Sequence, residues 1–112
     1  MKTGTIILVP FPFSELTEVK VRPAVVIAVT KDKFKDLVVC AISSVISERL
    51  TANEMLLESN STNNLRVDSV VKVDRIVTIK RESKIADLGK LSAEELKLFK
   101  KKFCNLVESN ND

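Results

Sequence analysis

Five polar side chains interrupt or end runs of residues that otherwise have the composition of buried β-strands. They are Arg22, Ser43, Lys72, Asp74 and Arg75. An arginine at the start of an apolar strand is costly to bury unless an anion meets it, so Arg22 indicates an anion-binding position. Lys72 and Asp74 alternate with apolar residues in a strand pattern, which places them side by side on one face. These five residues are the candidates for chemistry.

The chain contains no histidine among its 112 residues. Histidine is the commonest general base and metal ligand, and it activates the nucleophile in Ser-His and Cys-His arrangements. Without it, any catalysis must use Arg, Lys, Asp, Glu, Ser or Thr. Cys40 and Cys104 have no metal-ligand spacing, and we expect both to be small core side chains rather than a disulfide.

Length and composition predict one globular domain that spans residues 1–112. Apolar residues make up 45% of the chain and charged residues 29%, a balance typical of globular domains. No apolar run approaches the ~20 residues that a membrane-spanning helix requires, so we expect a soluble protein. The short apolar run near the start is followed at once by charged residues, without a small-residue cleavage site, so we expect a cytoplasmic location. The net charge of +3 weakly favours a polyanionic or acidic partner.

Five segments have the composition of β-strands: residues 5–11, 21–29, 37–42, 53–58 and 69–80. Proline cannot donate a hydrogen bond to a strand ladder. We therefore expect Pro10 and Pro12 to end the first segment and Pro23 to lie at the start of the second. Between the fourth and fifth segments, residues 59–64 have the composition of a loop.

The last of these segments has the longest alternating pattern in the chain. The residues expected on its apolar face are Val71, Val73, Val77 and Ile79. Arg75 interrupts that face. The interruption predicts that Arg75 lies near a strand end, at a bulge, or beside an acidic partner.

A C-terminal helix is predicted by a capping box formed by Ser92 and Glu95, with Leu91 and Leu96 at the hydrophobic-staple positions around it. Apolar side chains then recur at helical spacing, flanked by lysines that form a solvent-exposed face. The apolar stripe consists of Leu96, Phe99, Phe103, Leu106 and Val107. Short strands closed by one helix predict a mainly β fold (α+β), with a small, highly curved antiparallel sheet or barrel covered by the helix.

Three segments, in their order and spacing, resemble the MazF/PemK/Kid family of toxins from bacterial type II toxin–antitoxin pairs. The first is GTIILVPF followed by a loop and VRPAVVI, the second is VVCAISS, and the third is DSVVKVDRIVTI. The resemblance extends over about residues 3–107. It implies an SH3-like antiparallel β-barrel with a C-terminal helix, and a homodimer with a groove for single-stranded RNA. It also implies sequence-specific mRNA cleavage without a metal or other cofactor, and inhibition by a cognate antitoxin.

The resemblance also implies roles for the polar residues at the strand ends. Arg22 and Ser43 match an arginine and a threonine or serine implicated in RNA cleavage, and Lys72 with Asp74 matches a basic and acidic pair. Metal-free cleavage requires that the ribose 2′-hydroxyl lose its proton and that the phosphorane be stabilised. Arg22 would then bind the phosphate and Asp74 would act as the base. Ser43 would donate a hydrogen bond, and Lys72 would supply a second cation or the acid.

Further contacts to RNA are expected from Phe13, Glu18, Lys20, Ser44 and Arg75. Bases would stack on a phenylalanine or on an arginine plane, and local packing beside Pro12 is the alternative for the phenylalanines. In the family the first loop closes over the RNA. Here that loop reads SELTEVK, and it departs from the family's glycine and Glu-Gln pair.

These residues also have structural interpretations. Arg22 could be a structural arginine that pairs with Glu15 or Glu18. Lys72 and Asp74 could form an ordinary exposed pair on a sheet face. Two other functions fit this fold class: a gyrase-inhibiting toxin of the CcdB type, or a catalytically inactive barrel that binds RNA or protein. The CcdB type has an apolar, tryptophan-bearing C-terminus, whereas this chain ends in ESNND.

Overall fold

The computed structural model describes residues 1–12 and 19–108. The described elements are β1 (Thr5–Pro12), β2 (Val19–Val29), β3 (Leu37–Ser43), β4 (Glu54–Leu57), β5 (Ser69–Ile79), η1 (Arg81–Ser83), β6 (Ala86–Lys90) and α1 (Ala93–Glu108). Every segment predicted as a strand is therefore confirmed, with its ends displaced by at most two residues.

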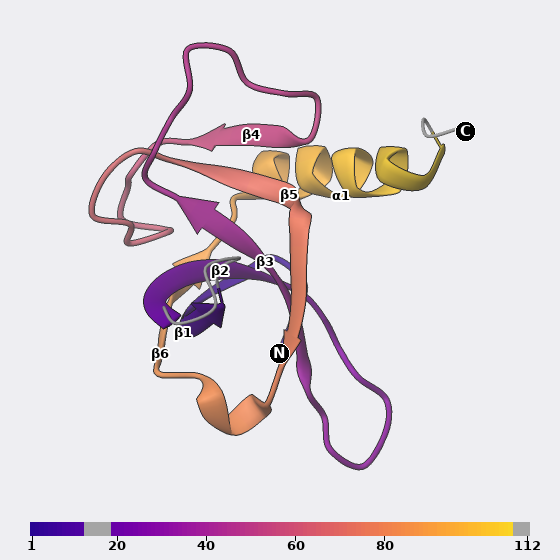
Figure 1. Ribbon diagram of the computed structural model, residues 1–112. Coiled ribbons are helices and arrows are strands. Elements are labelled where there is room, and N and C mark those ends of the chain that lie inside the picture. Colours follow the sequence, from indigo (N-terminus) through magenta and orange to yellow (C-terminus); the bar gives the residue numbers. More distant parts are fainter. Residues whose placement is uncertain (13–18, 109–112) are drawn as a thin grey trace.

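The strands form one antiparallel sheet in the order β4-β5-β3-β2-β1-β6, which curls into a half-barrel (Figure 1). Helix α1, yellow in Figure 1, lies beside β4 and the first half of β5. The predicted mainly β fold, a small curled antiparallel sheet with a C-terminal helix, is confirmed. The sheet is a half-barrel rather than a closed barrel, with β4 and β6 as its edge strands.

The prolines lie within strands, which corrects the prediction that they mark strand ends. Pro10 and Pro12 belong to β1, and Pro23 lies inside β2. Pairing of β1 with β6 ends at Leu8, and pairing of β2 with β3 begins at Ala24. Each proline thus occupies a stretch where its strand has a neighbour on one side, and there a missing N–H group is tolerated.

Strand β5 contains a bulge in its middle, where Figure 1 shows the strand changing direction sharply. Cys40 of β3 pairs with Ile76, but the next residue of β3, Ala41, pairs with Lys72. The β5 residues between these partners, Arg75 included, have no partner on β3. This irregularity confirms the bulge that the position of Arg75 predicted.

The bulge divides the apolar side chains of β5 between two cores. Val71 and Val73 belong to the first core, which includes Phe99 of α1. Val77 and Ile79 pack against the second core, which β1, β2 and β3 form. The alternation holds within each half of β5. The prediction of one continuous face is wrong because the bend directs the second half of the strand toward a different core.

The capping box of α1 is confirmed. The Ser92 N–H donates to Glu95 Oε1 at 2.8 Å, and the Glu95 N–H donates to Ser92 Oγ at 3.1 Å. Phe99 is buried as predicted, whereas Val107 is 80% exposed, so the apolar stripe ends before it. None of the helices within residues 1–12 and 19–108 has the length and apolar character needed to cross a membrane.

The two cysteines occupy different environments, and both are free thiols. Cys40 is buried in β3, as predicted, and burial raises the pKa of its thiol to about 12. Cys104 is exposed on α1, so the prediction of a core position is wrong for this residue. The lysine-rich surface of the helix extends around it, because the buried stripe of α1 is narrow.

The loop between β4 and β5, residues 58–68, is organised by side-chain amides. Asn63 is fully buried, and its amide donates to the carbonyl oxygen of Glu58 at 2.8 Å. The loop also reaches the opposite edge of the sheet, because the Lys90 N–H of β6 donates to the carbonyl oxygen of Thr62 at 3.1 Å. It therefore connects the two ends of the open half-barrel.

Gly89 of β6 lies so close to this loop that a side chain would not fit. A Cβ atom at this position would lie 2.1 Å from the carbonyl oxygen of Thr62. We expect Gly89→Ala to lower the free energy of unfolding by about 1–3 kcal/mol, because the loop must move to accept the methyl group. Urea denaturation measures this change, with Lys90→Ala at an exposed position of β6 as control. Equal stability of the two variants would contradict the close approach.

Candidate functional site

A hollow of about 490 Å³, which we call the site hollow, is formed by residues of β1, β2, β3 and β5. Its lining residues in the described part of the chain are Phe11, Arg22, Ala41, Ile42, Ser43, Lys72, Asp74, Arg75, Ile76 and Val77. The five polar residues identified from the sequence thus meet in one place, although they come from three different strands.

Strand register explains why Arg22, Ser43 and Lys72 share a face. The β2–β3 ladder pairs Ala24 with Ala41, and extending this register toward the start of β2 places Arg22 opposite Ser43. The β3–β5 ladder pairs Ala41 with Lys72. Because side chains alternate between the two faces of a sheet, all of these residues point to the same side. The short side chains of the two alanines leave space beside the longer polar ones.

Asp74 and Arg75 reach the site hollow because of the bulge in β5. In an uninterrupted strand, neighbouring residues point to opposite faces, yet both of these residues line the hollow. Both side chains are exposed, and neither residue pairs with β3. The bulge therefore adds a carboxylate and a second guanidinium group to the face that carries Arg22.

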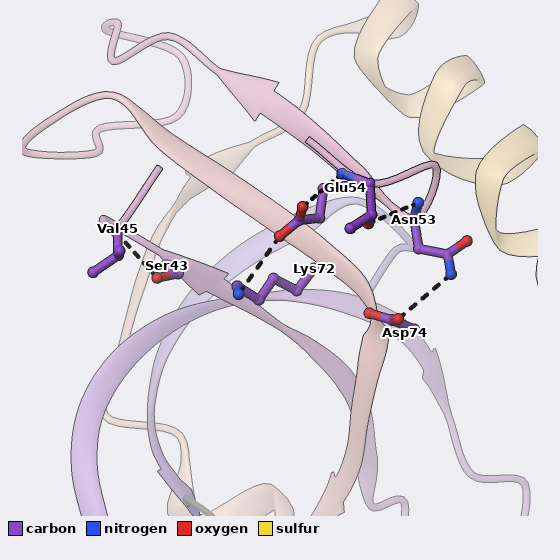
Figure 2. A network of polar contacts seen from close by, with 7 residues as sticks. Ser43, Val45, Asn53, Glu54, Lys72 and Asp74 are labelled. Atoms are coloured by element: carbon purple, nitrogen blue, oxygen red, sulfur yellow. Dashed lines mark hydrogen bonds and ion pairs between the residues drawn. The ribbon is translucent and has the colours of Figure 1, made fainter. Parts of the chain in front are cut away.

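Lys72 forms an ion pair with Glu54 of β4, as Figure 2 shows. The Lys72 Nζ atom lies 3.5 Å from Glu54 Oε2, and the Thr51 N–H donates to Glu54 Oε1 at 2.8 Å. The Glu54 side chain is 10% exposed. The hydrogen bond from Thr51 and the nearby Lys72 ammonium group hold the pKa of Glu54 below its ordinary value. Glu54 therefore stays ionised at neutral pH and positions Lys72.

Asp74 has a different partner. The side-chain amide of Asn53 donates to Asp74 Oδ2 over 3.4 Å (Figure 2). The carbonyl oxygen of Asn53 in turn accepts from the Val73 N–H at 2.9 Å. Lys72 and Asp74 thus lie in the same hollow, but their described partners are Glu54 and Asn53 rather than each other. A single long hydrogen bond leaves the Asp74 carboxylate with most of its acceptor capacity.

Ser43 ends β3 at the rim of the site hollow. Its Oγ atom accepts from the Val45 N–H at 3.1 Å (Figure 2), which leaves the hydroxyl hydrogen able to donate to another group. The following residue, Ser44, is exposed and lines a neighbouring hollow instead. The two serines, adjacent in sequence, therefore serve two different depressions of the surface.

The other residues predicted to bind RNA are only partly brought to this site. Lys20 is exposed on β2, opposite Phe11 of β1. Phe11 is 8% exposed and belongs to the second core, so it packs locally, although its edge lines the site hollow. Phe13 and Glu18 lie outside the described residues, as does Glu15, the other alternative partner for Arg22.

Sequence reasoning did not identify Asn53 and Glu54 as neighbours of the site. The available signal was charge complementarity, since Glu54 pairs directly with Lys72 across the β4–β5 ladder and opposite charges favour facing positions. Nothing local reveals that register, because the long loop between the two strands leaves their alignment open.

The charges of the site hollow favour an anionic ligand. Arg22, Lys72 and Arg75 contribute three cationic groups, and Asp74 is the carboxylate that lines the hollow in the described part of the chain. Among residues 1–12 and 19–108, no three His, Cys, Asp or Glu side chains gather as a metal site requires. A phosphate group matches these cations, because guanidinium and ammonium groups donate charge-assisted hydrogen bonds to its oxygens.

The sequence profile of one protein family, the PemK-like, MazF-like toxins of type II toxin-antitoxin systems, matches residues 2–107. The chain belongs to this family. The resemblance found in the three sequence segments is thereby confirmed for nearly the whole chain. Among curated protein sequences, none matches this MazF-like toxin.

Solved structures of toxins share the fold of this MazF-like chain. The Mycobacterium tuberculosis toxin MazF-mt6 gives a TM-score of 0.69 at 18% sequence identity, with 93% of this chain and 96% of that chain covered. An endoribonuclease in complex with its cognate antitoxin, from Mycobacterial species, gives a TM-score of 0.65 at 10% identity, with 98% and 97% covered. At such identities the similarity shows the fold alone.

The environment of Glu54 predicts how the stability of this MazF-like toxin depends on pH. Because folding lowers the pKa of Glu54, its contribution to stability is present above the ordinary value of 4.5 and is lost as the pH falls through the folded-state value. We expect Glu54→Gln to be less stable than wild type at neutral pH, with a difference that shrinks in acid. Urea denaturation of both proteins at neutral pH and at acidic pH tests this, with Glu82→Gln on η1 as control. A difference that does not change with pH would refute the prediction.

Proposed function

We propose that this MazF-like toxin is a sequence-specific endoribonuclease that cleaves single-stranded mRNA in the cytoplasm without a metal ion. The observation that carries this proposal is the site hollow, which gathers the cationic, hydroxyl and carboxylate groups that such a reaction uses. The proposed catalytic residues are Arg22, Ser43, Lys72 and Asp74. Membership of the MazF-like toxin family supports the same activity.

The proposed reaction is an internal phosphoryl transfer. The ribose 2′-oxygen attacks the adjacent phosphorus, the bond from phosphorus to the 5′-oxygen breaks, and the products carry a 2′,3′-cyclic phosphate and a 5′-hydroxyl. A base must take the 2′-hydroxyl proton, and an acid must protonate the 5′-oxygen. Asp74 is the proposed base, because its exposed carboxylate lines the hollow and keeps free acceptor capacity beside its bond from Asn53.

Arg22 is proposed to bind the scissile phosphate and to stabilise the charge that develops on it. Its guanidinium group offers paired donors that match phosphate oxygens. Ser43 donates a hydrogen bond to a phosphate oxygen. Lys72, positioned by Glu54, supplies a second cation or protonates the leaving oxygen.

RNA binding, the homodimer and the antitoxin extend this proposal beyond the catalytic residues. Phe13, Glu18, Lys20, Ser44 and Arg75 are the proposed RNA contacts around the hollow. The loop after β3 exposes apolar side chains, with Val45 at 75% and Ile46 at 43% exposure, and such surfaces favour association with a second protein chain. A cognate antitoxin would inhibit the enzyme by covering the groove.

Arg22→Ala tests the proposed mechanism directly. We expect the rate of RNA cleavage to fall at least about 100-fold, because the phosphorane loses its main cationic donor, while the fold is retained. Ser43→Ala should lose less, about tenfold, because it removes one neutral donor. The measurement is cleavage of a mixed-sequence RNA in the presence of a chelator, with detection of 2′,3′-cyclic phosphate or 3′-phosphate ends.

Arg81→Ala serves as the control, because Arg81 is exposed on η1 and lines neither hollow. Its turnover should match that of the wild-type protein. Turnover by Arg22→Ala at the wild-type rate would remove Arg22 from the mechanism. Wild-type protein that leaves diverse RNA sequences uncut would refute the nuclease itself. Growth inhibition on expression, relieved by Arg22→Ala, separates the enzyme from an inactive binding barrel.

A further inference from the structure

A second hollow of about 570 Å³ adjoins the site hollow, and we call it the flanking hollow. Arg22 and Ile42 line both hollows, so the two depressions meet at the strand ends that carry the candidate catalytic groups. Its volume lies within the range of ligand-binding pockets. Beside Arg22 and Ile42, its lining includes Val21, Ser44, Asn64, Arg66 and Val67.

We propose that the flanking hollow binds the nucleotide next to the scissile phosphate, with Arg66 as a specificity-determining residue that contacts this nucleotide. The proposal rests on the nuclease function proposed above and assigns a recognition subsite to it. An RNA strand whose phosphate is held at Arg22 must continue along the surface on either side of that phosphate. Arg22 lines the flanking hollow as well as the site hollow.

The charge of the flanking hollow matches a nucleotide. Among its described lining residues are two arginines, Arg22 and Arg66, and no aspartate or glutamate. Arg66 is exposed and forms no hydrogen bond or ion pair with the part of the chain that the structure describes. A guanidinium group in this position can bind a phosphate through paired donors or stack on a base.

The walls of the hollow offer both an apolar surface and hydrogen-bonding groups. Val21 is 55% exposed and Val67 is 54% exposed, which gives a base face two apolar contacts. Ser44 adds a hydroxyl. The side-chain amide of Asn64 donates to the carbonyl oxygen of Leu88, which leaves its amide oxygen able to accept from a base amino group. Exposed apolar groups beside directed polar groups are typical of nucleobase sites on single strands.

The wall that carries Arg66 is held by hydrogen bonds within the loop. Asn63, which precedes Asn64, is fully buried, and its side chain bonds to Glu58 and to the Leu65 N–H at 2.8 and 3.0 Å. Asn64 has a positive φ of 55°, which the loop bonds hold in place. A preorganised wall lowers the conformational entropy that binding must remove, and it makes discrimination between bases possible.

Binding of an RNA that cannot react tests the subsite without relying on catalysis. The probe is a mixed-sequence, single-stranded 2′-O-methyl RNA, which lacks the attacking hydroxyl group. We expect Arg66→Ala to weaken binding about tenfold, as loss of a charge-assisted contact predicts. The slope of log affinity against log salt should fall by about 0.7. Arg49→Ala, at an exposed arginine that lines neither hollow, is the matched control and should bind like wild type.

Cleavage of a random RNA pool provides the second readout. Sequencing of the product ends should show that Arg66→Ala loses base preference at one position beside the cut and keeps it at the others. Arg66→Lys, which retains the charge but lacks the paired donors, should lose the preference while binding less weakly than the alanine variant. If wild-type protein cuts no RNA, the nuclease function fails, whereas the binding measurement still decides the flanking hollow.

Three results would overturn the subsite. The first is that Arg66→Ala binds the RNA with the same affinity as the wild-type protein. The second is a change in the sedimentation of Arg66→Ala without RNA, which would identify the hollow as a contact with a second copy of the chain. The third is weaker binding of Arg66→Ala to the protein encoded by the gene immediately upstream, with unchanged base preference in RNA cleavage, which would assign the hollow to a protein partner.

Discussion

The interruption of the β3–β5 ladder between Cys40 and Ala41 is the constraint on which the rest of the structure depends. Extra residues on one strand of an antiparallel pair force that strand to bend and increase its twist. Here the bend lets β5 contribute to two apolar cores, one under α1 and one between the first three strands. The same extra residues include Asp74 and Arg75, so the curvature of the sheet and the composition of the site hollow have one cause.

The contacts around this bulge also explain how opposite charges share a hollow without neutralising each other. Glu54 engages Lys72, and Asn53 engages Asp74. Glu54 begins β4 and Asn53 immediately precedes it, and β4 pairs with β5 just before the bend. An ammonium group already paired with one carboxylate is less attracted to a second, so the Asp74 carboxylate keeps acceptor capacity beside its bond from Asn53. The edge strand β4 thus acts as a support for the polar groups of its neighbour.

Much of the fold follows from local sequence signals. Composition located the strands, the capping box located the start of α1, and Arg75 marked the bulge because a charged residue interrupted an apolar face. Local signals failed where the structure depends on which strands are neighbours. The prolines were predicted at strand ends. The sequence does not show that their strands are paired on one side only at these positions, because that depends on the order of strands in the sheet. Val107 was assigned to the core because helical spacing alone does not show where contact with the sheet stops. Cys104 was assigned to the core because cysteine is usually buried, which does not show the side of the helix on which it lies.

The candidate site was predictable to a similar extent. Arg22, Ser43 and Lys72 could each be recognised as polar residues on apolar strands, and strand alternation determines that they share a face once the register is known. Glu54 and Asn53 could not be recognised, because their importance arises from the pairing of β4 with β5. Arg66 lies just beyond residues 59–64, the segment with the composition of a loop, and nothing local indicates that it lines the same hollow as Arg22.

The loop of residues 58–68 also has a consequence for how the protein behaves in a crowded solution. An open half-barrel has two edge strands, and unpaired edge groups are templates for pairing with other chains, which leads to aggregation. The Lys90 N–H of β6 is occupied by Thr62, and the carbonyl oxygen of Leu88 by Asn64. The opposite edge, β4, is a short strand of four residues. The loop therefore protects the exposed end of the sheet against uncontrolled strand addition, a hazard that a closed barrel avoids by having no edges.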